Sequence, residues 1–340
     1  MNIWIRADGN DEIASGHLRR TLTIAEALRR QGEEVLFLLA DEESRGVFLQ
    51  LTDANRAGWK YMLLGCAYGD LEGELRRMEE LMRVGVPDVL LVDSYAAAPE
   101  YYEHLKDTAS SCRIACLDDL MAFDPPVDLV INYAPDVAAA EAFYHHAPVR
   151  LLGPAYAPLR SQFAGMQPQT REHVGCILIS TGGSDPFRMA DAATEAVRDA
   201  LERAAPAGKV ELVYTAPGHP YVSNMAALLK KCDLAVSAGG TTLYELCAAG
   251  VPAIAFSMAD NQQIFAQKMA AAGACTYAGD VRDPGERRLV SERIRTWVAA
   301  HCTEGSGRGM GLSLRRREAQ RMHALTDGCG AARIAQELRR

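Results

Sequence analysis

Short apolar runs alternate with helix-length segments along almost the whole of this 340-residue chain. In the first part of the chain the apolar runs have the length of buried strands, and they cover residues 2–7, 35–40, 88–93, 113–117 and 127–132. The segment 17–30 repeats apolar residues such as Leu18 and Leu22 at helical spacing. Continuous apolar strands separated by helices are typical of a parallel sheet that helices cover on both faces.

The same alternation restarts after residues 144–171, which are rich in Pro, Ala and Gln and have no clear period. Strands are expected at 176–180, 210–214, 234–236 and 252–257, and helices at 189–204 and 261–272. We therefore expect an α/β protein with two doubly wound Rossmann-like domains, at residues 1–150 and 173–310, a connection at 151–172 and a helical tail at 311–340. Two such domains favour a ligand in the cleft between their strand carboxyl ends. The Gly- and Ser-rich interruption 305–314 has no assigned role.

The composition excludes several classes of protein. Hydrophobic residues make up 49% of the chain and charged residues 24%, as in globular proteins. A net charge of −8 argues against a nucleic-acid binder, which would carry a basic face. The sequence has no apolar run near the ~20 residues that cross a bilayer, and its first residues do not resemble a signal peptide. We expect a cytoplasmic protein without membrane or nucleic-acid partners, and no pattern specifies an oligomeric state.

The cysteine and histidine patterns give no metal site. Nine cysteines are an odd number without a Cys-x-x-Cys pair. Six of them lie in or beside apolar stretches and are expected to be buried, reduced thiols: Cys112, Cys116, Cys176, Cys232, Cys247 and Cys275. Because the chain also lacks a His-x-x-x-His pair and a clustered Asp motif, we expect neither a metal nor another cofactor.

The segment 237–245, Ser-Ala-Gly-Gly-Thr-Thr-Leu-Tyr-Glu, begins where an apolar strand ends and a helix starts. Gly239 and Gly240 allow a sharp turn and leave room for a ligand beside the backbone. Thr241 or Thr242 would cap the helix, whose free N–H groups bind anions. Together with Ser237, these residues are predicted to hold a phosphate, although an ordinary tight turn would have the same pattern. The glycine spacing fits neither a Walker loop nor a dinucleotide fingerprint, which favours a nucleotide sugar.

Three polar residues near this segment would contact other parts of such a ligand. Glu245 lies one helical turn beyond the threonines, where a carboxylate would accept hydrogen bonds from ribose hydroxyls. Asn261 and Gln262 open the next expected helix and would suit sugar hydroxyl or amide groups. A surface glutamate and two helix-capping residues would look the same.

A second group of polar residues follows the first strand. Arg6 and Asp8 end that strand, and a polar loop leads through Gly16 to His17 at a helix start. The loop after the first strand of a doubly wound domain is a frequent place for functional groups. A helix N-terminus favours the neutral form of histidine, so His17 would act as a base. Arg6 and Asp8 would orient the loop or the substrate. A histidine that only starts the helix is the alternative.

These segments together resemble one family in their order along nearly the whole chain. They are Arg6-Ala-Asp8, Ser15-Gly-His-Leu-Arg-Arg20, Tyr156-Ala-Pro-Leu-Arg160, Gly182-Gly-Ser-Asp185, the segment 237–245, Ala259-Asp-Asn-Gln262 and Asp327-Gly-Cys-Gly-Ala331. The family is that of the UDP-2,4-diacetamido-2,4,6-trideoxy-β-L-altropyranose hydrolases of pseudaminic acid biosynthesis, which belong to the glycosyltransferase-B superfamily. The Gly-His and Gly-Gly-Thr-Thr segments are shared with the wider superfamily, and their combination with the Leu-Arg and Asp-Asn-Gln segments is more specific to the hydrolases.

The resemblance implies a role for each matching residue. His17 would be the catalytic base, and residues 239–242 would hold the diphosphate of UDP. Glu245 would bind the ribose, Asn261 the sugar, and Gly182 and Gly183 would complete the UDP site. Arg160 would reach into the cleft from the connection between the domains. Ala14 departs from the pattern, because relatives often carry glycine there.

We therefore expect a hydrolase in which water, activated by His17, attacks the anomeric carbon of a UDP-linked amino sugar. The alternatives are a glycosyltransferase that uses the same donor and a non-catalytic protein that binds nucleotide sugars. Release of UDP without an acceptor would separate the hydrolase from both.

Overall fold

Seven parallel strands form the first sheet in the computed structural model, which describes residues 1–52, 58–206, 208–220, 222–303 and 310–340. Their spatial order is β3-β2-β1-β4-β5-β6-β7. The bounds are β1 (Asn2–Ala7), β2 (Glu34–Leu39), β3 (Lys60–Leu63), β4 (Val89–Asp93), β5 (Arg113–Leu117), β6 (Leu129–Asn132) and β7 (Val149–Leu152). The chain runs outward from β1 to β3 and then returns to the other side of β1 with β4. The strand order therefore reverses between β1 and β4, which is where doubly wound sheets bind ligands.

Helices connect these strands, and their bounds are α1 (Gly16–Arg30), α2 (Glu42–Thr52), α3 (Leu71–Val84), α4 (Pro99–Thr108) and α5 (Val137–Phe143). Two short 3₁₀ turns follow β7, at η2 (Pro154–Tyr156) and η3 (Ser161–Phe163). Helix α1 buries the apolar face that its spacing predicts, with Leu18 and Leu28 fully buried. It packs against α12 (Gly330–Leu338), the last helix of the chain. The helix that carries His17 is therefore held from both sides.

Five parallel strands form the second sheet among the described residues, in the order β12-β11-β10-β8-β9. The strand bounds are β8 (Cys176–Ser180), β9 (Glu211–Thr215), β10 (Leu234–Ala238), β11 (Ala253–Ser257) and β12 (Thr276–Asp280). The helix bounds are α6 (Met189–Ala204), α7 (Met225–Leu229), α8 (Thr242–Ala249), α9 (Asp260–Ala271), α10 (Pro284–Cys302) and α11 (Met310–Leu325). Strand order reverses between β8 and β10. The loops after these two strands contain the two glycine pairs identified from the sequence.

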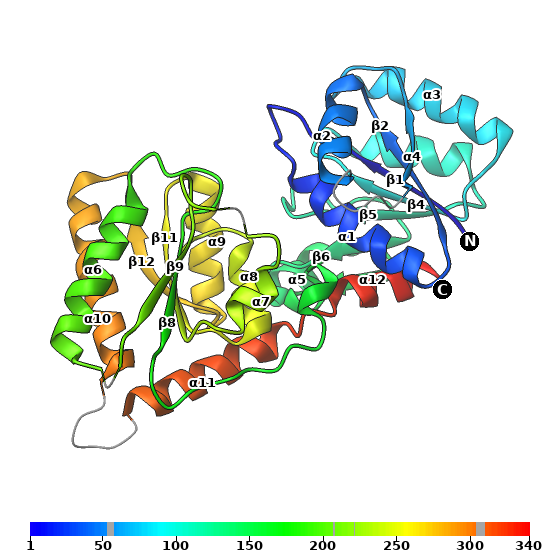
Figure 1. The fold of residues 1–340 in the computed structure, drawn as a ribbon. Helices are drawn as coiled ribbons and strands as arrows, with labels where there is room; N and C mark the ends of the chain where they lie inside the picture. The colour runs from blue at the N-terminus through cyan, green and yellow to red at the C-terminus, as the bar shows by residue number, and fades with distance from the viewer. Residues whose placement is uncertain (53–57, 207, 221, 304–309) are drawn as a thin grey trace. The chain divides into compact units, whose positions relative to one another are not determined.

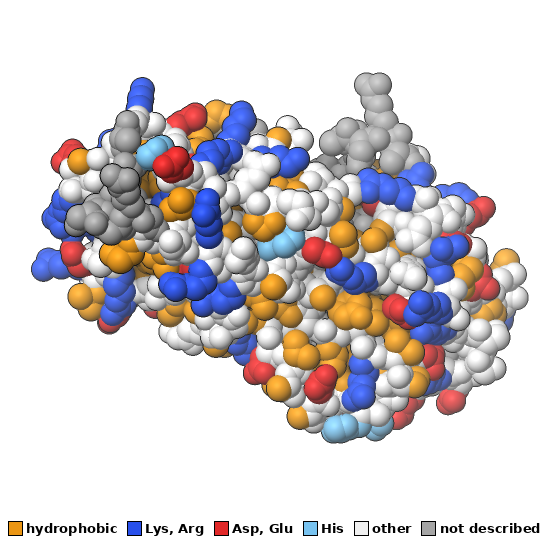
Figure 2. Space-filling model, turned by 90° about the horizontal axis from the view of Figure 1, so that it is seen from below, with side chains coloured by type: hydrophobic (Ala, Val, Ile, Leu, Met, Phe, Trp, Pro, Cys, Tyr) orange, Lys and Arg blue, Asp and Glu red, His pale blue; other side chains and the backbone are white. Residues whose placement is uncertain are grey.

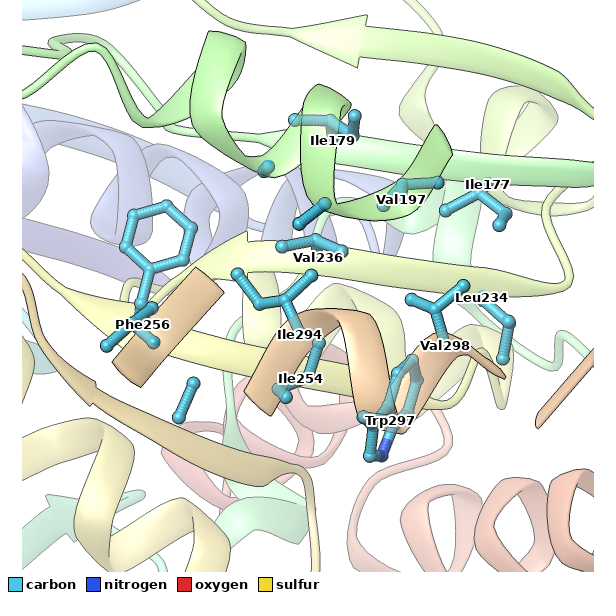
Figure 3. Close-up of a cluster of buried hydrophobic side chains, with 14 of the residues drawn as sticks. Ile177, Ile179, Val197, Leu234, Val236, Ile254, Phe256, Ile294, Trp297 and Val298 are labelled. Carbon is cyan, nitrogen blue, oxygen red and sulfur yellow. The ribbon is translucent and has the colours of Figure 1, made fainter. Parts of the chain in front are cut away.

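A tight apolar core fixes one face of the second sheet. Helices α6 and α10 lie beside each other on that face (Figure 1). Figure 3 shows Ile177 and Val236 from the strands facing Ile294 and Val298 from α10. All four side chains are fully buried, so each contributes about 1.5–3 kcal/mol of burial free energy. This packing holds β8 and β10 in place and leaves their carboxyl-end loops to carry polar groups.

Contacts divide the chain into two compact units, residues 1–161 with 329–340 and residues 162–328. This division differs from the expected boundaries at the end of the chain. The expected tail 311–340 is not one piece, because α11 packs within the second unit and α12 within the first. Of the interruption 305–314, the part before Met310 lies outside the described residues, and the remainder is the start of α11. The two-domain, doubly wound α/β architecture is confirmed.

The strands β3, β7 and β12 were not predicted from the sequence. Two of them are the outer strands of the first sheet and one is an outer strand of the second. Their residues are partly exposed, whereas the inner strand β4 is buried throughout. An edge strand needs no continuous apolar run, because only one side of it pairs with the sheet. The apolar signal therefore fails at three of the four outer strands, and only β9 was predicted, at 210–214.

The predicted state of the cysteines is confirmed. All nine lie in described segments and none forms a disulfide, and the six that were expected to be buried are buried. The basic run 315–317 in α11 contains one buried side chain. Arg315 is only 3% exposed and donates hydrogen bonds to the carbonyl oxygens of His301, Arg171 and Glu172.

One face of the molecule carries charges of both signs. On the face that Figure 2 shows, Lys and Arg side chains are interspersed with Asp and Glu side chains. Among the helices in the described part of the chain, we find none with the length and apolarity that a membrane span requires.

Candidate functional site

His17 and Asp93 meet at the point where the first sheet reverses its strand order. His17 is the second residue of α1, which follows β1, and Asp93 is the last residue of the neighbouring strand β4. The Nδ1 atom of His17 lies 2.6 Å from Oδ1 of Asp93. The residues are 3% and 1% exposed. A carboxylate accepts but does not donate, so Nδ1 carries a proton and Nε2 is the ring nitrogen that does not face Asp93.

Asp93 is ionised although it is buried. Burial opposes its charge, but the Arg20 guanidinium and hydrogen bonds from Arg20 and His17 outweigh burial and lower the pKa of Asp93 to about 2. The carboxylate is thus charged at neutral pH and holds His17 in one tautomer. This arrangement matches the carboxylate–histidine pairs that orient catalytic bases.

Arg20 connects the carboxyl ends of three strands around this pair. Its Nε donates to Oδ2 of Asp93 and its Nη2 to Oδ1, both over 2.6 Å. Its Nη1 donates to Asp119 after β5 and, over 3.0 Å, to the hydroxyl of Tyr133 after β6. Burial opposes the charge of Arg20, but Asp93 and its other partners raise the pKa of Arg20 well above its usual value.

Tyr95 covers one side of the His17 ring. The two ring centroids are 4.3 Å apart and the planes are nearly perpendicular, at 77°. The Tyr95 hydroxyl donates to Oδ2 of Asp119 over 3.2 Å. Because Tyr95 is 46% exposed, it borders solvent on one side and the His17 ring on the other.

Arg6 and Asp8 lie in a buried charge network instead of on the surface. Each is 1% exposed, and Arg6 forms an ion pair with Asp8. Arg6 also donates two hydrogen bonds to Glu74 of α3, over 2.7 and 2.6 Å. Asp8 accepts the backbone N–H of Ala40 over 2.8 Å. Of the two roles expected for these residues, orientation of the loop fits this burial better than contact with a substrate.

The loop between β1 and α1 contains one unfavourable backbone conformation. Asn10 accepts the backbone N–H groups of Glu12 and Ile13, each over 2.9 Å, and pairs with Ala14 as an isolated bridge. Ala14 has a φ of 55°, in the left-handed region that favours glycine. This conformation gives a physical reason why glycine suits position 14. Gly16, two residues later, is exposed and has no atom within 4 Å of where a side chain would point.

We expect Ala14→Gly to stabilise the protein by about 0.5–1 kcal/mol, because the left-handed strain of alanine exceeds the entropy cost of glycine. Urea unfolding of the two proteins measures the difference. Ala138→Gly is the matched control, since Ala138 is an exposed alanine inside α5. It should destabilise by about 1 kcal/mol. A loss of stability in both variants would mean that the strain at position 14 is negligible.

The loop after β10 differs at its two glycines. The backbone N–H of Gly239 donates to the carbonyl of Phe256 over 2.7 Å. A Cβ at Gly239 would lie 2.8 Å from Cβ of Ala266 and from the carbonyl oxygen of Gln262, so glycine is required for packing against α9. A Cβ at Gly240 would have no atom within 4 Å. Only Gly240 therefore leaves open space at the start of α8.

The N-terminus of α8 has backbone N–H groups without partners in the helix and lacks a side-chain cap. Thr241 occupies the N-cap position, yet its side chain makes no capping hydrogen bond, which differs from the expected threonine cap. Helix-terminal N–H groups such as those of Thr241 and Thr242 have no partner within their own helix. Ser237 is fully buried, and its hydroxyl donates to the carbonyl of Ala238 over 3.0 Å. Glu245 lies in the first turn of α8 and is half-buried.

Asn261 and Gln262 lie in the first turn of α9, whose N-cap is Ala259, so neither is the cap. Asn261 is exposed, and its Oδ1 accepts the backbone N–H of Gln262 over 2.9 Å. The Gln262 side chain accepts the backbone N–H of Met258 over 3.0 Å. Asn261 thus presents its amide to solvent, while Gln262 closes the helix start.

The glycine pair after β8 forms a loop at the start of α6. Gly182 has a φ of 76°, and Gly183 is exposed. Asp185 accepts the backbone N–H groups of Met189 and Ala190, the first two residues of α6, over 2.7 and 2.8 Å. The hydroxyl of Thr181, a residue only 2% exposed, has no hydrogen-bond partner among the described residues.

Arg160 is half-buried between the two 3₁₀ turns η2 and η3, at the end of the first unit. Within the described segments, no three His, Cys, Asp or Glu side chains gather closely enough to hold a metal ion.

Sequence reasoning missed four residues around His17: Arg20, Asp93, Tyr95 and Asp119. Two signals were present in the sequence. Asp93 ends a strand predicted at 88–93, and Arg20 belongs to the motif at residues 15–20. Only the order of the strands shows that β4 neighbours β1 and brings Asp93 to His17.

Comparison with a family model matches residues 181–290 to the glycosyltransferase family 28 C-terminal domain. This stretch contains both glycine pairs of the second unit, Glu245 and Asn261. The match covers the loops at the strand reversal of that unit.

Three curated proteins are similar in sequence. A spore coat polysaccharide biosynthesis protein, SpsG of Bacillus subtilis, is 25% identical over 82% of this chain and 84% of its own length. The pseudaminic acid cytidylyltransferase and UDP-2,4-diacetamido-2,4,6-trideoxy-beta-L-altropyranose hydrolase of Helicobacter pylori is 27% identical over 56% of this chain. An uncharacterized protein of Methanocaldococcus jannaschii is 22% identical over 75% of this chain. The matches span only 38% of the Helicobacter protein and 55% of the archaeal one.

Solved structures of similar fold include glycosyltransferases. MurG of Acinetobacter baumannii superposes with a TM-score of 0.65 over 99% of both chains, at 15% identity. The spinosyn rhamnosyltransferase SpnG, complexed with thymidine diphosphate, superposes with a TM-score of 0.57 over the full length of both chains, at 17% identity. The chain therefore has the glycosyltransferase-B fold.

Proposed function

We propose that this protein is a cytoplasmic enzyme of pseudaminic acid biosynthesis that hydrolyses a UDP-linked diacetamido-trideoxy sugar to UDP and the free sugar. The observation that carries the proposal is the buried pair of His17 and Asp93 at the strand reversal of the first sheet, with Nε2 free to accept a proton. The name of the Helicobacter relative supports this substrate, as do the motifs that resemble the hydrolase family.

The reaction that fits these groups is a displacement by water. The water oxygen forms a bond to the anomeric carbon, and the bond from that carbon to the diphosphate oxygen breaks. UDP leaves with the electron pair, and Nε2 of His17 takes the proton of the water. Asp93 holds the ring and stabilises the imidazolium that forms. A positioned base of this kind contributes roughly 10²–10⁴ in rate.

In this proposal the second unit holds UDP. The N–H groups of Thr241 and Thr242 at the start of α8 donate to the diphosphate, because a helix N-terminus favours anions. Gly240 leaves room for the diphosphate, and Gly239 sets the loop against α9. Glu245 accepts hydrogen bonds from the ribose. The remaining UDP-site residues shape the backbone of the two loops: Ser237, Gly182 and Gly183.

The remaining residues of the proposal contact or orient the sugar. Asn261, whose side chain is exposed, and Arg160 bind the sugar, and Gln262 orients Asn261. Gly16 allows the sugar close to the His17 backbone. Arg6 and Asp8 act through the loop that they anchor.

A glycosyltransferase that passes the sugar to an acceptor is the second candidate. The match to the family 28 C-terminal domain and the likeness to MurG favour it. Both reactions use the same donor site, so only the fate of the sugar separates them.

We expect the purified protein to release UDP from UDP-diacetamido-trideoxy sugars in water without any acceptor. An assay of UDP release against a panel of UDP-sugars measures this, with each sugar also tested in the presence of candidate acceptors. Release that requires an acceptor would identify a transferase, and binding without release a sensor.

The same assay tests the expectation that no metal is needed. The N–H groups at the start of α8 would stabilise the negative charge of the diphosphate, which a metal cation does in other enzymes. The rate should therefore stay the same in excess chelator. A rate that falls with chelator and returns with magnesium or manganese would contradict this part of the proposal.

A further inference from the structure

Arg20 lies against the one nitrogen of His17 that already carries a proton. Its Nη2 atom is 3.1 Å from Nδ1 of His17 and 2.6 Å from the Asp93 oxygen that Nδ1 also contacts. We propose that Arg20 is a positioning residue that keeps His17 neutral in the resting protein. This inference rests on the proposed function, in which neutral His17 is the base.

The short contact between Arg20 and His17 is not a hydrogen bond between them. Oδ1 of Asp93 accepts from both His17 and Arg20, so Nδ1 and Nη2 both point a hydrogen toward it. Neither nitrogen has a lone pair for the other. The 3.1 Å approach is therefore a contact between two donors that share one acceptor. A second proton, on Nε2, would place a cation beside a cation in a buried site.

Asp93 alone would have the opposite effect. A buried carboxylate 2.6 Å from a histidine favours the charged imidazolium. Arg20 counters this in two ways. Its guanidinium donates hydrogen bonds to both carboxylate oxygens of Asp93, and its positive charge disfavours a second proton on His17. Its side chain is 11% exposed, so water screens that charge weakly.

Other titratable groups surround this cluster from several elements. Asp119 after β5 forms an ion pair with Arg20, and 28% of its side chain is exposed, whereas the Asp93 side chain is fully buried. Further groups in the described part of the chain are Tyr95 after β4, Tyr133 after β6 and Tyr68 after β3, which is within electrostatic range of Asp93. Cys116 at the end of β5 is also within electrostatic range of Asp93, and burial raises the pKa of its thiol, so it is neutral. All three tyrosines are neutral near pH 7. Arg20 is therefore the cation that faces the ring within this cluster.

Titration of His17 by NMR in the free protein tests the inference, with His17→Asn to assign the signal. In Arg20→Gln the midpoint of the titration should rise by at least about one pH unit, as expected for removing a cation at this distance. Arg20→Lys keeps the charge and should stay within about half a unit of wild type. An unchanged or lower midpoint in folded Arg20→Gln overturns the inference.

A second pair of variants covers the case in which Arg20→Gln does not fold because it leaves Asp93 buried without its partner. Asp93→Asn and the double variant Asp93→Asn/Arg20→Gln differ only in the cation. The midpoint should be higher in the double variant. Equal midpoints overturn the inference.

Activity gives the independent readout. In Arg20→Gln the acid limb of the pH profile of kcat/KM should move to higher pH with the titration, and Arg20→Lys should restore it. A purely structural role would lower the melting temperature and leave both midpoints in place, which would contradict the inference. The titration needs no substrate, so it decides the role of Arg20 even if His17→Asn retains activity and the proposed hydrolysis fails.

Discussion

His17→Asn is expected to lower kcat by at least ~10²-fold, the loss typical of removing a general base. Asparagine keeps a side-chain N–H that can donate to Asp93, so the buried carboxylate retains a partner. It has no group that takes a proton from water at neutral pH. Because the interaction is lost only in the transition state, KM should stay within a few fold. Steady-state kinetics measures kcat and KM of the folded variant. Calorimetry with UDP checks that the variant still binds UDP.

The alternative for His17, a residue that merely starts α1, gives a different result. Asparagine is well accepted at a helix start, so the rate would barely change. His104→Asn is the matched control, because His104 lies in the same unit, on the surface, and contacts Glu79 over 2.6 Å. Its kcat should equal that of wild type. A kcat within threefold of wild type in His17→Asn would remove His17 from the mechanism.

Gly240→Val is expected to weaken UDP binding by more than tenfold without unfolding the protein. The backbone at Gly240 does not have a positive φ, and a Cβ there meets no atom within 4 Å, so valine fits the folded chain. Its methyl groups would fill the space that the diphosphate needs beside the first N–H groups of α8. Calorimetry with UDP measures the affinity, and a thermal melt confirms folding.

Two further variants separate binding from packing. Gly240→Ala adds one methyl group and should give an intermediate affinity. Gly239→Ala would meet Ala266 and the backbone of Gln262 at 2.8 Å, so it should destabilise the protein by about 1–3 kcal/mol. An unchanged UDP affinity in folded Gly240→Val would place the diphosphate elsewhere.

The difference between these two glycines could not be predicted from the sequence. Both follow the same strand and both permit a sharp turn. Gly239 is restricted by α9, which lies more than twenty residues further along the chain, and Gly240 is not. The missing cap at Thr241 could not be predicted either. Threonine is a suitable residue type for a cap, but here its backbone is helical and its side chain makes no capping hydrogen bond. Local patterns indicate what a residue is able to do, and its distant neighbours decide whether it does so.

The sequence by itself determined the class of the fold and the loops that we predict to carry function. Apolar runs and helical spacing specify buried strands and their covering helices, and the Gly-His and Gly-Gly steps mark the loops after β1, β8 and β10. The tertiary structure alone decided which side chains meet. Asp93 lies 76 residues from His17 in sequence and reaches it because β4 pairs with β1. Arg6 and Asp8, polar residues after an apolar run, are buried because Glu74 arrives from α3. Residue spacing encodes local periodicity, but strand order and burial depend on the packing of the whole chain, so they follow only from the folded structure.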